Sequence, residues 1–392
     1  MSRKKKTLCV TAAVLVLLVA AYFVAAYSHI GFIEKWRTLW IETAMTTNSH
    51  QWLAKLFPQS VIDEVMADME AQKEAQKSLA STWDSLVPID VVYGKQTEPA
   101  DSEQEEFFAR YWELDTEEFR AHLERNPQLL ADGYGHIMIE DMEGALGLKT
   151  KQGHPLLVLD AANGLVIVKV SGEGYQGKLA IAKEAANVDL VKSNRLGVRG
   201  QEAAEFGAQE DALLVINMSG FRDVGGHGSG GEVKGSLIID GAEYGSPAYE
   251  PHWRFCGLKE DNKLYVSNYP KDSVSDYRWG VEFYPAIIVD GECVVDGSYC
   301  MGLQPRTVVG QSVKGDMLLL VVDGRQIGYS LGCTVADCAK ILEGYEAYQA
   351  MNMDGGSSSV MWYNGEYITK ASSVSGRGRY MPDALVVRRN NE

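Results

Sequence analysis

The chain has 392 residues, 46% of them hydrophobic, so it is long enough to bury a large core in two or three domains. Asp and Glu number 53 against 37 Lys and Arg, and the formal net charge is -16. This balance argues against nucleic acid as a main partner, because nucleic-acid binding needs a basic surface that neutralises phosphates. It leaves room for a substrate with a single phosphate, which two or three arginines can hold.

The N-terminus carries a membrane signal. Basic residues at positions 3–6 precede an uncharged apolar run over residues 7–27. At ~1.5 Å rise per residue this run spans roughly 31 Å, enough to cross a ~30 Å hydrocarbon core. The basic cluster predicts a single-pass cell-membrane protein with a cytoplasmic N-terminus and an extracellular C-terminal domain. A cleaved signal peptide is the alternative, because small residues at 20–21 and 24–26 offer cleavage sites. The run is longer than a usual signal segment, which favours a retained anchor.

Residues 28–129 are expected to separate the anchor from the main domain. Apolar residues recur at three- and four-residue steps between 28 and 86, which predicts helix. Residues 98–126 are rich in Glu and are interpreted as a solvated spacer. The predicted organisation is therefore an anchor (1–27), a helical and acidic stalk and linker (28–129), and a domain over 130–392. A helix pair packed on the main domain is the alternative for the first part of the stalk.

After about residue 130 glycine becomes frequent, and short β-branched runs alternate with turn signals. Strands are expected at 156–159, 165–170, 179–182, 213–216, 237–239, 263–266, 286–289 and 318–322. Asn-Gly or Asp-Gly pairs, which favour hairpin turns, stand at 163–164, 240–241, 290–291 and 364–365. Helices are expected over 201–206 and over 334–343, where Thr334 can cap the first turn. Hairpins with few helices predict an α+β, strand-rich domain and not alternating βαβ units.

Two phosphate-loop patterns and two cysteine pairs need separate treatment. The stretch 172–178 reads G-x-x-x-x-G-K but lacks the following Ser or Thr, and 226–231 reads G-x-G-x-x-G without a helix after it. Both are interpreted as turns. Export would permit disulfides, and 293/300 and 333/338 are the two candidate pairs, although the spacing establishes neither.

Polar residues gather at the ends of several expected strands in the C-terminal half. The stretches concerned are 217–221, 304–307, 323–325, 352–359 and 379–382. Each of them alone could be a turn or a surface ion pair. Together they combine acids, arginines and paired glycines, which is what an active-site floor needs: strands fix the side chains, and glycines let a substrate approach the backbone.

These residues resemble the phosphodiester glycosidase family, which includes the lysosomal uncovering enzyme and bacterial proteins named for exopolysaccharide biosynthesis. The matching motifs lie at 217–221, 304–311, 323–325, 352–358 and 379–385, within about 150–390. Val308, Met353 and Asp383 replace residues that are commoner in the family. The anchor with residues 43–47 and 49–54 resembles the membrane-anchored Gram-positive branch.

The resemblance implies a hydrolase that cleaves sugar-1-phosphodiester bonds in envelope or exopolysaccharide-type glycans. An oxocarbenium-like centre calls for carboxylates, so Asp323 and Asp354 are the expected catalytic residues, with their separate roles left open. A leaving phosphate calls for guanidinium donors. The expected substrate-binding residues are Arg306, Arg325, Arg379, Asn217, Gly355, Gly356 and Ser357.

Two other functions remain open at this point: a non-catalytic envelope protein that binds anionic glycans, and a purely structural surface protein. The two aspartates favour the interpretation as an enzyme, because a protein that only binds anions gains nothing from carboxylates beside its phosphate-binding residues. No metal-ligand spacing is present among the histidines. Oxygen-rich loops with Asp and Asn would suit a divalent cation such as calcium, but no spacing specifies one.

Overall fold

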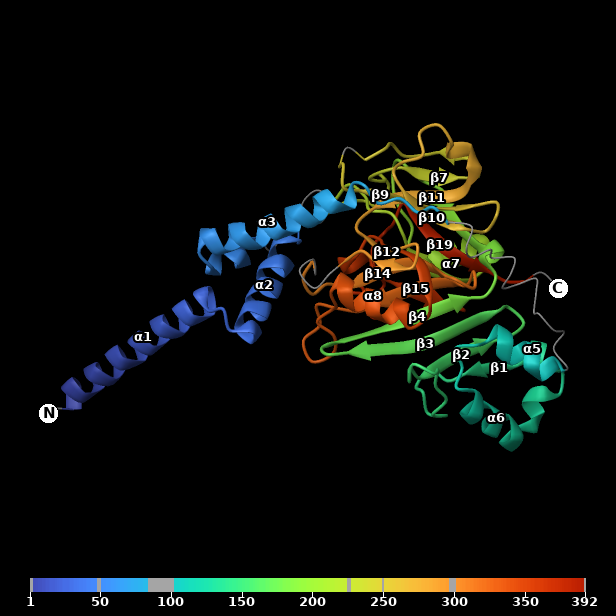
Figure 1. The fold of residues 1–392 in the computed structure, drawn as a ribbon, viewed down its shortest axis with the longest axis horizontal. Helices are drawn as coiled ribbons and strands as arrows, with labels where there is room; N and C mark the ends of the chain where they lie inside the picture. Colours follow the sequence, from blue (N-terminus) through green and yellow to red (C-terminus); the bar gives the residue numbers. More distant parts are fainter. Residues whose placement is uncertain are drawn as a thin grey trace.

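The computed structural model describes residues 3–47, 51–83, 102–223, 227–248, 250–295 and 301–390. An N-terminal arm of helices leads into a domain rich in antiparallel strands (Figure 1). The arm consists of α1 (Arg3–Tyr27), α2 (Gly31–Met45), the 3-10 helix η1 (Gln51–Leu56) and α3 (Gln59–Gln76). The strand-rich domain with helices confirms the predicted α+β class.

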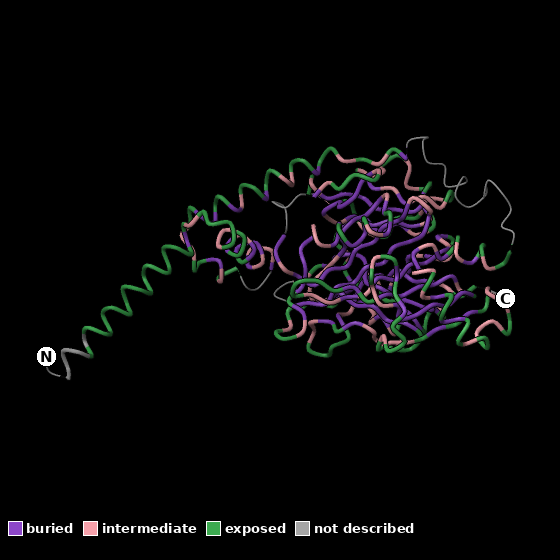
Figure 2. The backbone as a smooth tube through the Cα atoms, turned by 60° about the horizontal axis from the view of Figure 1, so that its bottom comes forward, coloured by how far each residue is buried: buried purple, intermediate pink, exposed green. Residues whose placement is uncertain are grey.

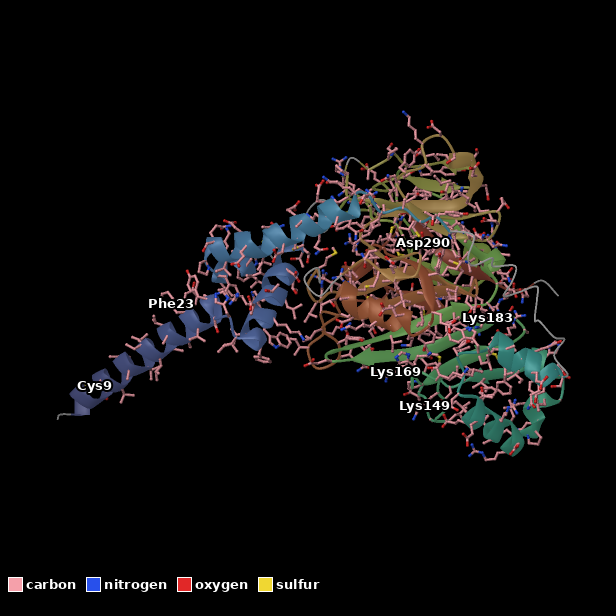
Figure 3. The ribbon with its side chains drawn as sticks, in the orientation of Figure 1. Cys9, Phe23, Lys149, Lys169, Lys183 and Asp290 are labelled. Carbon is pink, nitrogen blue, oxygen red and sulfur yellow. The ribbon has the colours of Figure 1, made fainter. Side chains whose placement is uncertain are left out.

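Helix α1 extends away from the domain and exposes its apolar side chains (Figure 2). Its segment Cys9–Tyr27 has a mean hydropathy of 2.6 and is only 6% buried. An apolar helix of this length can cross a membrane, as an anchor or as a signal sequence. Figure 3 shows Cys9 and Phe23 on this helix, well away from the strands.

Helices α2 and α3 pack against each other around Ile41, Val61 and Val65, which are buried. The arm also contacts the domain: the Gln76 side-chain amide donates to the Ala286 carbonyl oxygen at 3.2 Å and accepts from the Ala286 amide at 2.9 Å. The C-terminal end of α3 therefore contacts the domain.

Three antiparallel sheets form the domain in the part of the chain that the structure describes. The nine-stranded sheet has the order β1 (Met138–Glu140), β2 (Leu156–Asp160), β3 (Leu165–Gly172), β4 (Tyr175–Ala182), β15 (Met317–Val322), β14 (Arg306–Ser312), β16 (Ala347–Asn352), β12 (Ala286–Val289) and β13 (Glu292–Cys293). A second sheet has the order β10 (Leu264–Ser267), β9 (Arg254–Lys259), β11 (Tyr277–Phe283), β7 (Leu237–Ile239) and β8 (Ala242–Glu243). The third has the order β18 (Glu366–Tyr367), β17 (Met361–Tyr363), β6 (Ala212–Asn217), β19 (Asp383–Arg388) and β5 (Val188–Lys192).

Three of the four predicted Asp-Gly and Asn-Gly pairs form tight hairpins, and the fourth, Asn163-Gly164, ends the four-residue connection between β2 and β3. Asp240, Asp290 and Asn364 each have a positive φ of 45–49°, and the glycine that follows each also has a positive φ. These turns join β7 to β8, β12 to β13 and β17 to β18. Two successive residues in the left-handed region are what a two-residue turn needs to match the twist of its strands.

The main core lies where the three sheets meet. Leu319 of the nine-stranded sheet, Trp279 of the second and Leu385 of the third belong to one buried cluster. Helix α7 (Ala203–Glu210) covers the other side of the third sheet, and α8 (Val335–Glu343) packs on the nine-stranded sheet. As predicted, the Thr334 side chain caps α8, accepting from the amide of Asp337 at 3.1 Å.

The acidic segment is not a solvated spacer where the structure describes it. Residues 103–125 form α5 (Glu103–Arg110) and α6 (Thr116–Arg125), whose Phe107, Phe119 and Leu123 join the core beneath the nine-stranded sheet. Most of the glutamates that suggested a spacer occupy the first turns and outer faces of these amphipathic helices, whereas Glu113, between the helices, is buried. Residues 98–101 lie outside the described part of the chain.

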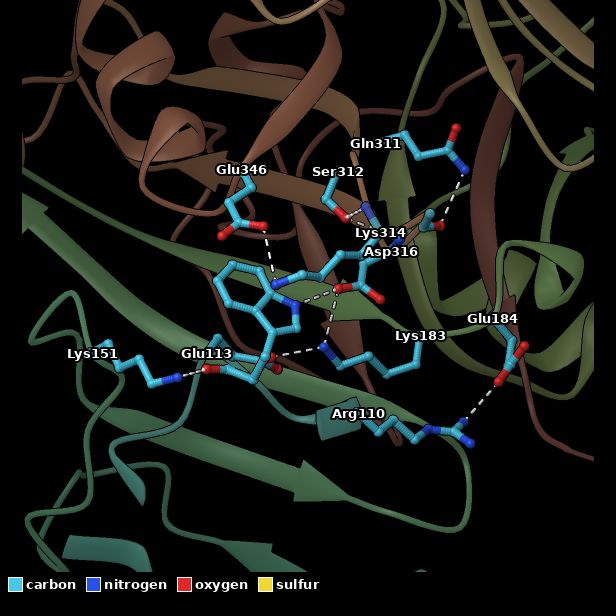
Figure 4. Close-up of polar contacts among 12 residues, drawn as sticks. Arg110, Glu113, Lys151, Lys183, Glu184, Gln311, Ser312, Lys314, Asp316 and Glu346 are labelled. Atoms are coloured by element: carbon cyan, nitrogen blue, oxygen red, sulfur yellow. Dashed lines mark hydrogen bonds and ion pairs between the residues drawn. The ribbon is translucent and has the colours of Figure 1, made fainter. Parts of the chain in front are cut away.

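A buried ion cluster fastens this helical segment to the sheet (Figure 4). The Lys183 ammonium, at the end of β4, lies 2.8 Å from Glu113 and 3.1 Å from Asp316. All three side chains are at most 3% exposed. The Trp112 indole also donates to Asp316, at 3.1 Å. Such burial is tolerated because every charge has a charged or hydrogen-bonded neighbour.

The two phosphate-loop patterns and the two candidate cysteine pairs of the sequence remain to be placed in the structure. The G-x-x-x-x-G-K stretch lies in the β3–β4 hairpin, which confirms that it is a turn. Residue 226, which opens the G-x-G-x-x-G stretch, and Cys300 lie outside the described residues, so the 293/300 pair has no structural account. The Cys333 and Cys338 sulfurs lie 3.4 Å apart as buried thiols.

Candidate active site

A cleft of about 660 Å³ opens at one end of the nine-stranded sheet. Residues from all five motifs that the sequence singled out line it, at 220–221, 304–306, 325, 352–358 and 379. The paired register Arg306↔Val322 places the start of β14 at this end of the sheet, and Asn352 closes β16 beside Val308. The loop before β14 and the loops after its two antiparallel neighbours, β15 and β16, thus meet at one edge.

Arg306 begins β14 and is 4% exposed. Its Nε donates to the Cys333 carbonyl at 3.2 Å, and its Nη2 donates to the carbonyls of Met301 and Gly302 at 2.8 and 3.0 Å. Backbone carbonyls hold the guanidinium without neutralising it. The group therefore keeps its full charge in a site where an anion would be its strongest partner.

Arg325 lies beside Arg306 and is held by Gln304. Its Nε and Nη2 donate to the Gln304 Oε1 at 3.1 and 2.6 Å. A Cβ on Gly356 would stand only 3.1 Å from the Arg325 guanidinium nitrogens, so glycine is needed for this close approach. Gly356 has a φ of +64°, which also favours glycine. Burial and the charge of Arg306 lower the pKa of Arg325.

Arg379 is the third arginine that lines the cleft, but unlike the other two it is paired with a carboxylate, that of Asp223. Its two terminal nitrogens donate to the two carboxylate oxygens of Asp223, at 3.0 and 3.1 Å. These hydrogen bonds lower the pKa of Asp223. Asp223 was not among the predicted site residues. It follows the 217–221 motif by only two positions, and a carboxylate so near a strand-end motif is the signal that could have found it.

Asp354 lies between these arginines on the loop after β16, and it is half-buried at the floor of the cleft. Burial raises its pKa to about 6, against the hydrogen bonds from Ser358 and the Gly355 amide and the charge of Arg379. Its backbone is fixed, because the Asp354 amide donates to Met218 and its carbonyl accepts from the Asn217 side chain at 2.6 Å. A carboxyl with this pKa is mostly ionised at neutral pH and still basic enough to accept a proton.

The predicted donors around Asp354 divide into two groups. Gly355, Gly356 and Ser357 line the cleft, as a substrate-binding loop must. Asn217 does not line it. Its Oδ1 accepts from the Thr307 hydroxyl at 2.7 Å and from the Val360 amide at 3.1 Å. The Asn217 side chain therefore holds together three segments of the site and is placed to position Asp354.

Asp323, the other predicted catalytic acid, is not among the residues that line the cleft. It is 1% exposed, and its two carboxylate oxygens accept from the Tyr329 hydroxyl and the Lys370 amide, each at 2.8 Å. Burial raises its pKa. The structure brings together Asp354, Arg306, Arg325 and Arg379, and it leaves Asp323 as the anchor of the loop that carries Arg325.

Asp383, which replaces a commoner family residue, lies fully buried near Asp354. Its Oδ1 accepts from the Ser219 amide at 2.9 Å, and its Oδ2 has no hydrogen-bond partner among the described residues. Burial raises its pKa to about 7, and the negative charge of Asp354 adds to the rise. Asp354, which lines the cleft, and Asp383, which is buried near it, thus both hold protons more tightly than usual.

Part of the cleft comes from residues that sequence reasoning did not select. Trp253 and Tyr284 form an aromatic wall with ring centroids 5.6 Å apart, and the Lys234 ammonium lies 4.9 Å from the Trp253 ring centre. Thr46 and Thr47, at the end of α2, line another side. An aromatic face beside cations suits a sugar ring next to an anion. None of these residues belongs to a motif at a strand end, so only the fold shows that they are near.

The described residues contain no group of three or more His, Cys, Asp or Glu side chains that could hold a metal ion. The sequence specified no metal site and left a divalent cation such as calcium open, and that question stays untested, because backbone and amide oxygens can also be its ligands.

Comparison with known proteins agrees with the motifs. The family model described as phosphodiester glycosidase matches residues 210–388. The SPbeta prophage-derived uncharacterized protein YomE of Bacillus subtilis (strain 168) is 24% identical over 241 residues, which is 56% of this chain and 36% of that protein. The chain thus spans about a third of the length of this curated relative.

Among solved structures, the catalytic domain of zebrafish N-acetylglucosamine-1-phosphodiester alpha-N-acetylglucosaminidase, auto-inhibited by its pro-peptide, has a TM-score of 0.47 at 16% identity. The match covers 58% of this chain and 82% of that one. A hypothetical protein from Synechocystis has a TM-score of 0.43 at 11% identity, over 59% and 63% of the two chains. These likenesses are too distant to transfer a ligand or a residue's role.

Proposed function

We propose that this chain, whose residues 210–388 belong to the phosphodiester glycosidase family, hydrolyses sugar-1-phosphodiester bonds in glycans. The observation that carries the proposal is that Asp354, a carboxylate with a raised pKa, lines one cleft together with Arg306 and Arg325, two guanidinium groups that have no carboxylate partner among the described residues. Water and the phosphodiester give a free sugar and a phosphomonoester as the bond between C1 and the phosphate oxygen breaks.

Arg306 and Arg325 would hold the phosphate, since their fixed positions point donors at one anion from two sides. The charge that develops on the leaving oxygen is shared with this phosphate, so a strong general acid is less necessary than for an ordinary glycoside. Arg379 is already paired with Asp223, and we assign it to holding that wall and tuning Asp354.

Asp354 would take a proton from the water that attacks C1, and it would stabilise the positive charge that builds up on the sugar ring. Gly355, Gly356 and Ser357 would place amide and hydroxyl donors along the substrate. Trp253 and Tyr284 would support the sugar face. Asn217 and Asp323 would act by holding the loops of Asp354 and Arg325.

We also propose that α1 is a retained membrane anchor, with the N-terminus in the cytoplasm and the domain extracellular. The basic residues before the apolar run support this orientation. In that location a phosphodiester-linked glycan of the cell envelope would be the substrate.

The test measures release of sugar from a soluble sugar-1-phosphodiester by the purified full chain in detergent micelles. Asp354→Asn should lower kcat by about 10³-fold or more, because the isosteric amide cannot accept the proton. Arg306→Ala should raise KM by about 100-fold. Asp189→Asn is the matched control: Asp189 lies on β5 and is not among the residues that line the cleft, so kcat should change by less than about threefold.

Equal turnover by wild type and Asp354→Asn would refute the assignment. Saturable glycan binding without release of sugar by the wild type would instead support a non-catalytic protein that binds anionic glycans.

A further inference from the structure

The end of helix α2 is joined to the loop formed by residues 301–304, more than 250 positions later in the chain. The Thr43 hydroxyl accepts from the Leu303 amide at 2.9 Å, and the Glu42 Oε2 accepts from the Gly302 amide at 3.1 Å. A Cβ on Gly302 would stand 2.4 Å from the Thr43 backbone nitrogen. The helix and the loop are therefore in direct backbone contact.

This loop is also what holds the two arginines of the cleft. Arg306 donates to the carbonyls of Met301 and Gly302, and Arg325 donates to Gln304 through two nitrogens. The side-chain nitrogen of Gln304, Nε2, in turn donates to the Thr43 carbonyl at 3.2 Å and to the Thr46 hydroxyl at 3.3 Å. A continuous chain of hydrogen bonds thus runs from α2 to both guanidinium groups.

The residues that directly follow the helix reach the cleft itself. Thr46, the C-cap of α2, and Thr47 are among its lining residues. They do not fill it, because the cleft retains about 660 Å³ with α2 in place. An inhibitory plug would occupy the position of the substrate, whereas these residues form an edge of the space.

We propose that the juxtamembrane helix α2 is a working part of the active site: Thr46 and Thr47 form a substrate-binding wall, and Thr43 is a positioning residue for Arg306 and Arg325. This inference rests on the proposed function. Two guanidinium groups bind one phosphate more tightly when their spacing is fixed before binding, because mobile side chains would lose conformational entropy when the phosphate binds. The helix supplies that fixation from outside the domain.

The experiment compares Thr43→Val and Thr46→Val with Thr43→Ser and Thr46→Ser in the full chain in micelles. Valine removes the hydroxyl at nearly constant volume, and serine keeps it. We expect the valine variants to raise KM for a sugar-1-phosphodiester about 5- to 20-fold with kcat within about threefold. Serine should restore KM to within about twofold of the wild type. Thr38→Val, on the same helix, is the matched control and should not change KM.

Calorimetric titration with inorganic phosphate gives a second readout that needs no turnover. The dissociation constant should rise by a similar factor in Thr43→Val and in Gly302→Ala, whose added Cβ would push the loop from the helix. If no variant, including the wild type, releases sugar but phosphate binding weakens as expected, the proposed function fails and the role of α2 stands.

Unchanged KM and phosphate affinity in folded Thr43→Val, Thr46→Val and Gly302→Ala would overturn the proposal. An increase in activity in these variants would overturn it too, because it would identify α2 as an inhibitor. If one valine variant does not fold, KM and phosphate affinity of the other valine variant, compared with those of its serine counterpart, decide whether the proposal holds.

Discussion

The cluster around Lys183 and the cleft around Asp354 both place charges at the ends of strands of the nine-stranded sheet, but at opposite ends. Strand β15 shows the relation: Asp316 precedes its first residue, while its last residue, Val322, pairs with Arg306. At the Lys183 end the carboxylates contact a lysine directly. At the Arg306 end, the guanidinium groups of Arg306 and Arg325 donate to backbone carbonyls and to the side-chain oxygen of Gln304. Both guanidinium groups also line the cleft.

This difference separates charges that hold the fold from charges that await a ligand. A buried charge whose partners are all protein groups adds no binding capacity, and its loss shows as a loss of stability. A buried charge held only by neutral dipoles remains able to bind an ion of opposite sign. The three predictions below test this contrast, from the largest expected effect to the smallest.

Lys183→Met should lower the free energy of unfolding by about 3–5 kcal/mol, because it leaves Glu113 and Asp316 buried together without a cation. The measurement is denaturant unfolding of the full chain, with KM measured under native conditions and expected to be unchanged. Arg110→Met is the matched control: its pair with Glu184 is 41% exposed on both sides, so it should cost less than about 1 kcal/mol. Equal costs for the two variants would contradict the contrast.

Asp383→Asn should raise the free energy of unfolding at pH 8 by about 2 kcal/mol. Burial raises the pKa of Asp383 to about 7 from 3.8, so the folded state binds this proton more tightly than the unfolded state. Stability from this group is therefore lost as the pH rises through about 7 and regained as the pH falls toward 4. Asparagine cannot ionise and avoids the loss.

The check on Asp383→Asn is the denaturant midpoint at pH 8 and at pH 5, with a gain expected at pH 8 that is much smaller at pH 5. Asp189→Asn, which loses ion pairs with Arg278 and Arg388, should show no gain at either pH. A gain of the same size at both pH values would exclude ionisation as its cause.

The pH dependence of kcat/KM should report Asp354, the carboxylate on the other side of the contrast. Its pKa of about 6 predicts a fall of about tenfold per pH unit below that value, because the reacting form is ionised. Asp223→Asn should move this limb to lower pH by about half a unit, since the negative charge of Asp223 raises the pKa of Asp354. Asp337→Asn, at the cap of α8, should leave the limb in place. A shift to higher pH would contradict this assignment.

Much of the domain could be predicted from the sequence because its signals are local. The Asp-Gly turn at Asp240, the Thr334 cap and the alternation of β-branched runs depend on neighbours a few positions away. The meeting of Arg306, Arg325 and Asp354 could be expected because their motifs all stand at strand ends. Asp323 and Asp354 could not be told apart, since both precede glycine after a buried strand and only the surrounding loops decide which faces the cleft.

The contributions from outside the motifs could not be predicted. Thr43 reaches the active-site loop across 260 positions, and no periodicity in the sequence encodes that contact. The packing of the acidic helices α5 and α6 on the domain was missed for a related reason. Their charge dominates the composition, while the few aromatic side chains that pack on the sheet, such as Phe107 and Phe119, are spread thinly among the glutamates.

The outermost strands of the three sheets have a consequence for a protein concentrated on a surface. The nine-stranded sheet ends in β1 with three residues and β13 with two, and the third sheet ends on one side in β18 with two. Short outer strands offer few free amides and carbonyls to a neighbouring copy, which discourages strand addition between molecules. If α1 anchors the chain in a bilayer, as proposed, crowding of many copies should therefore leave them as separate particles and not as fibrils.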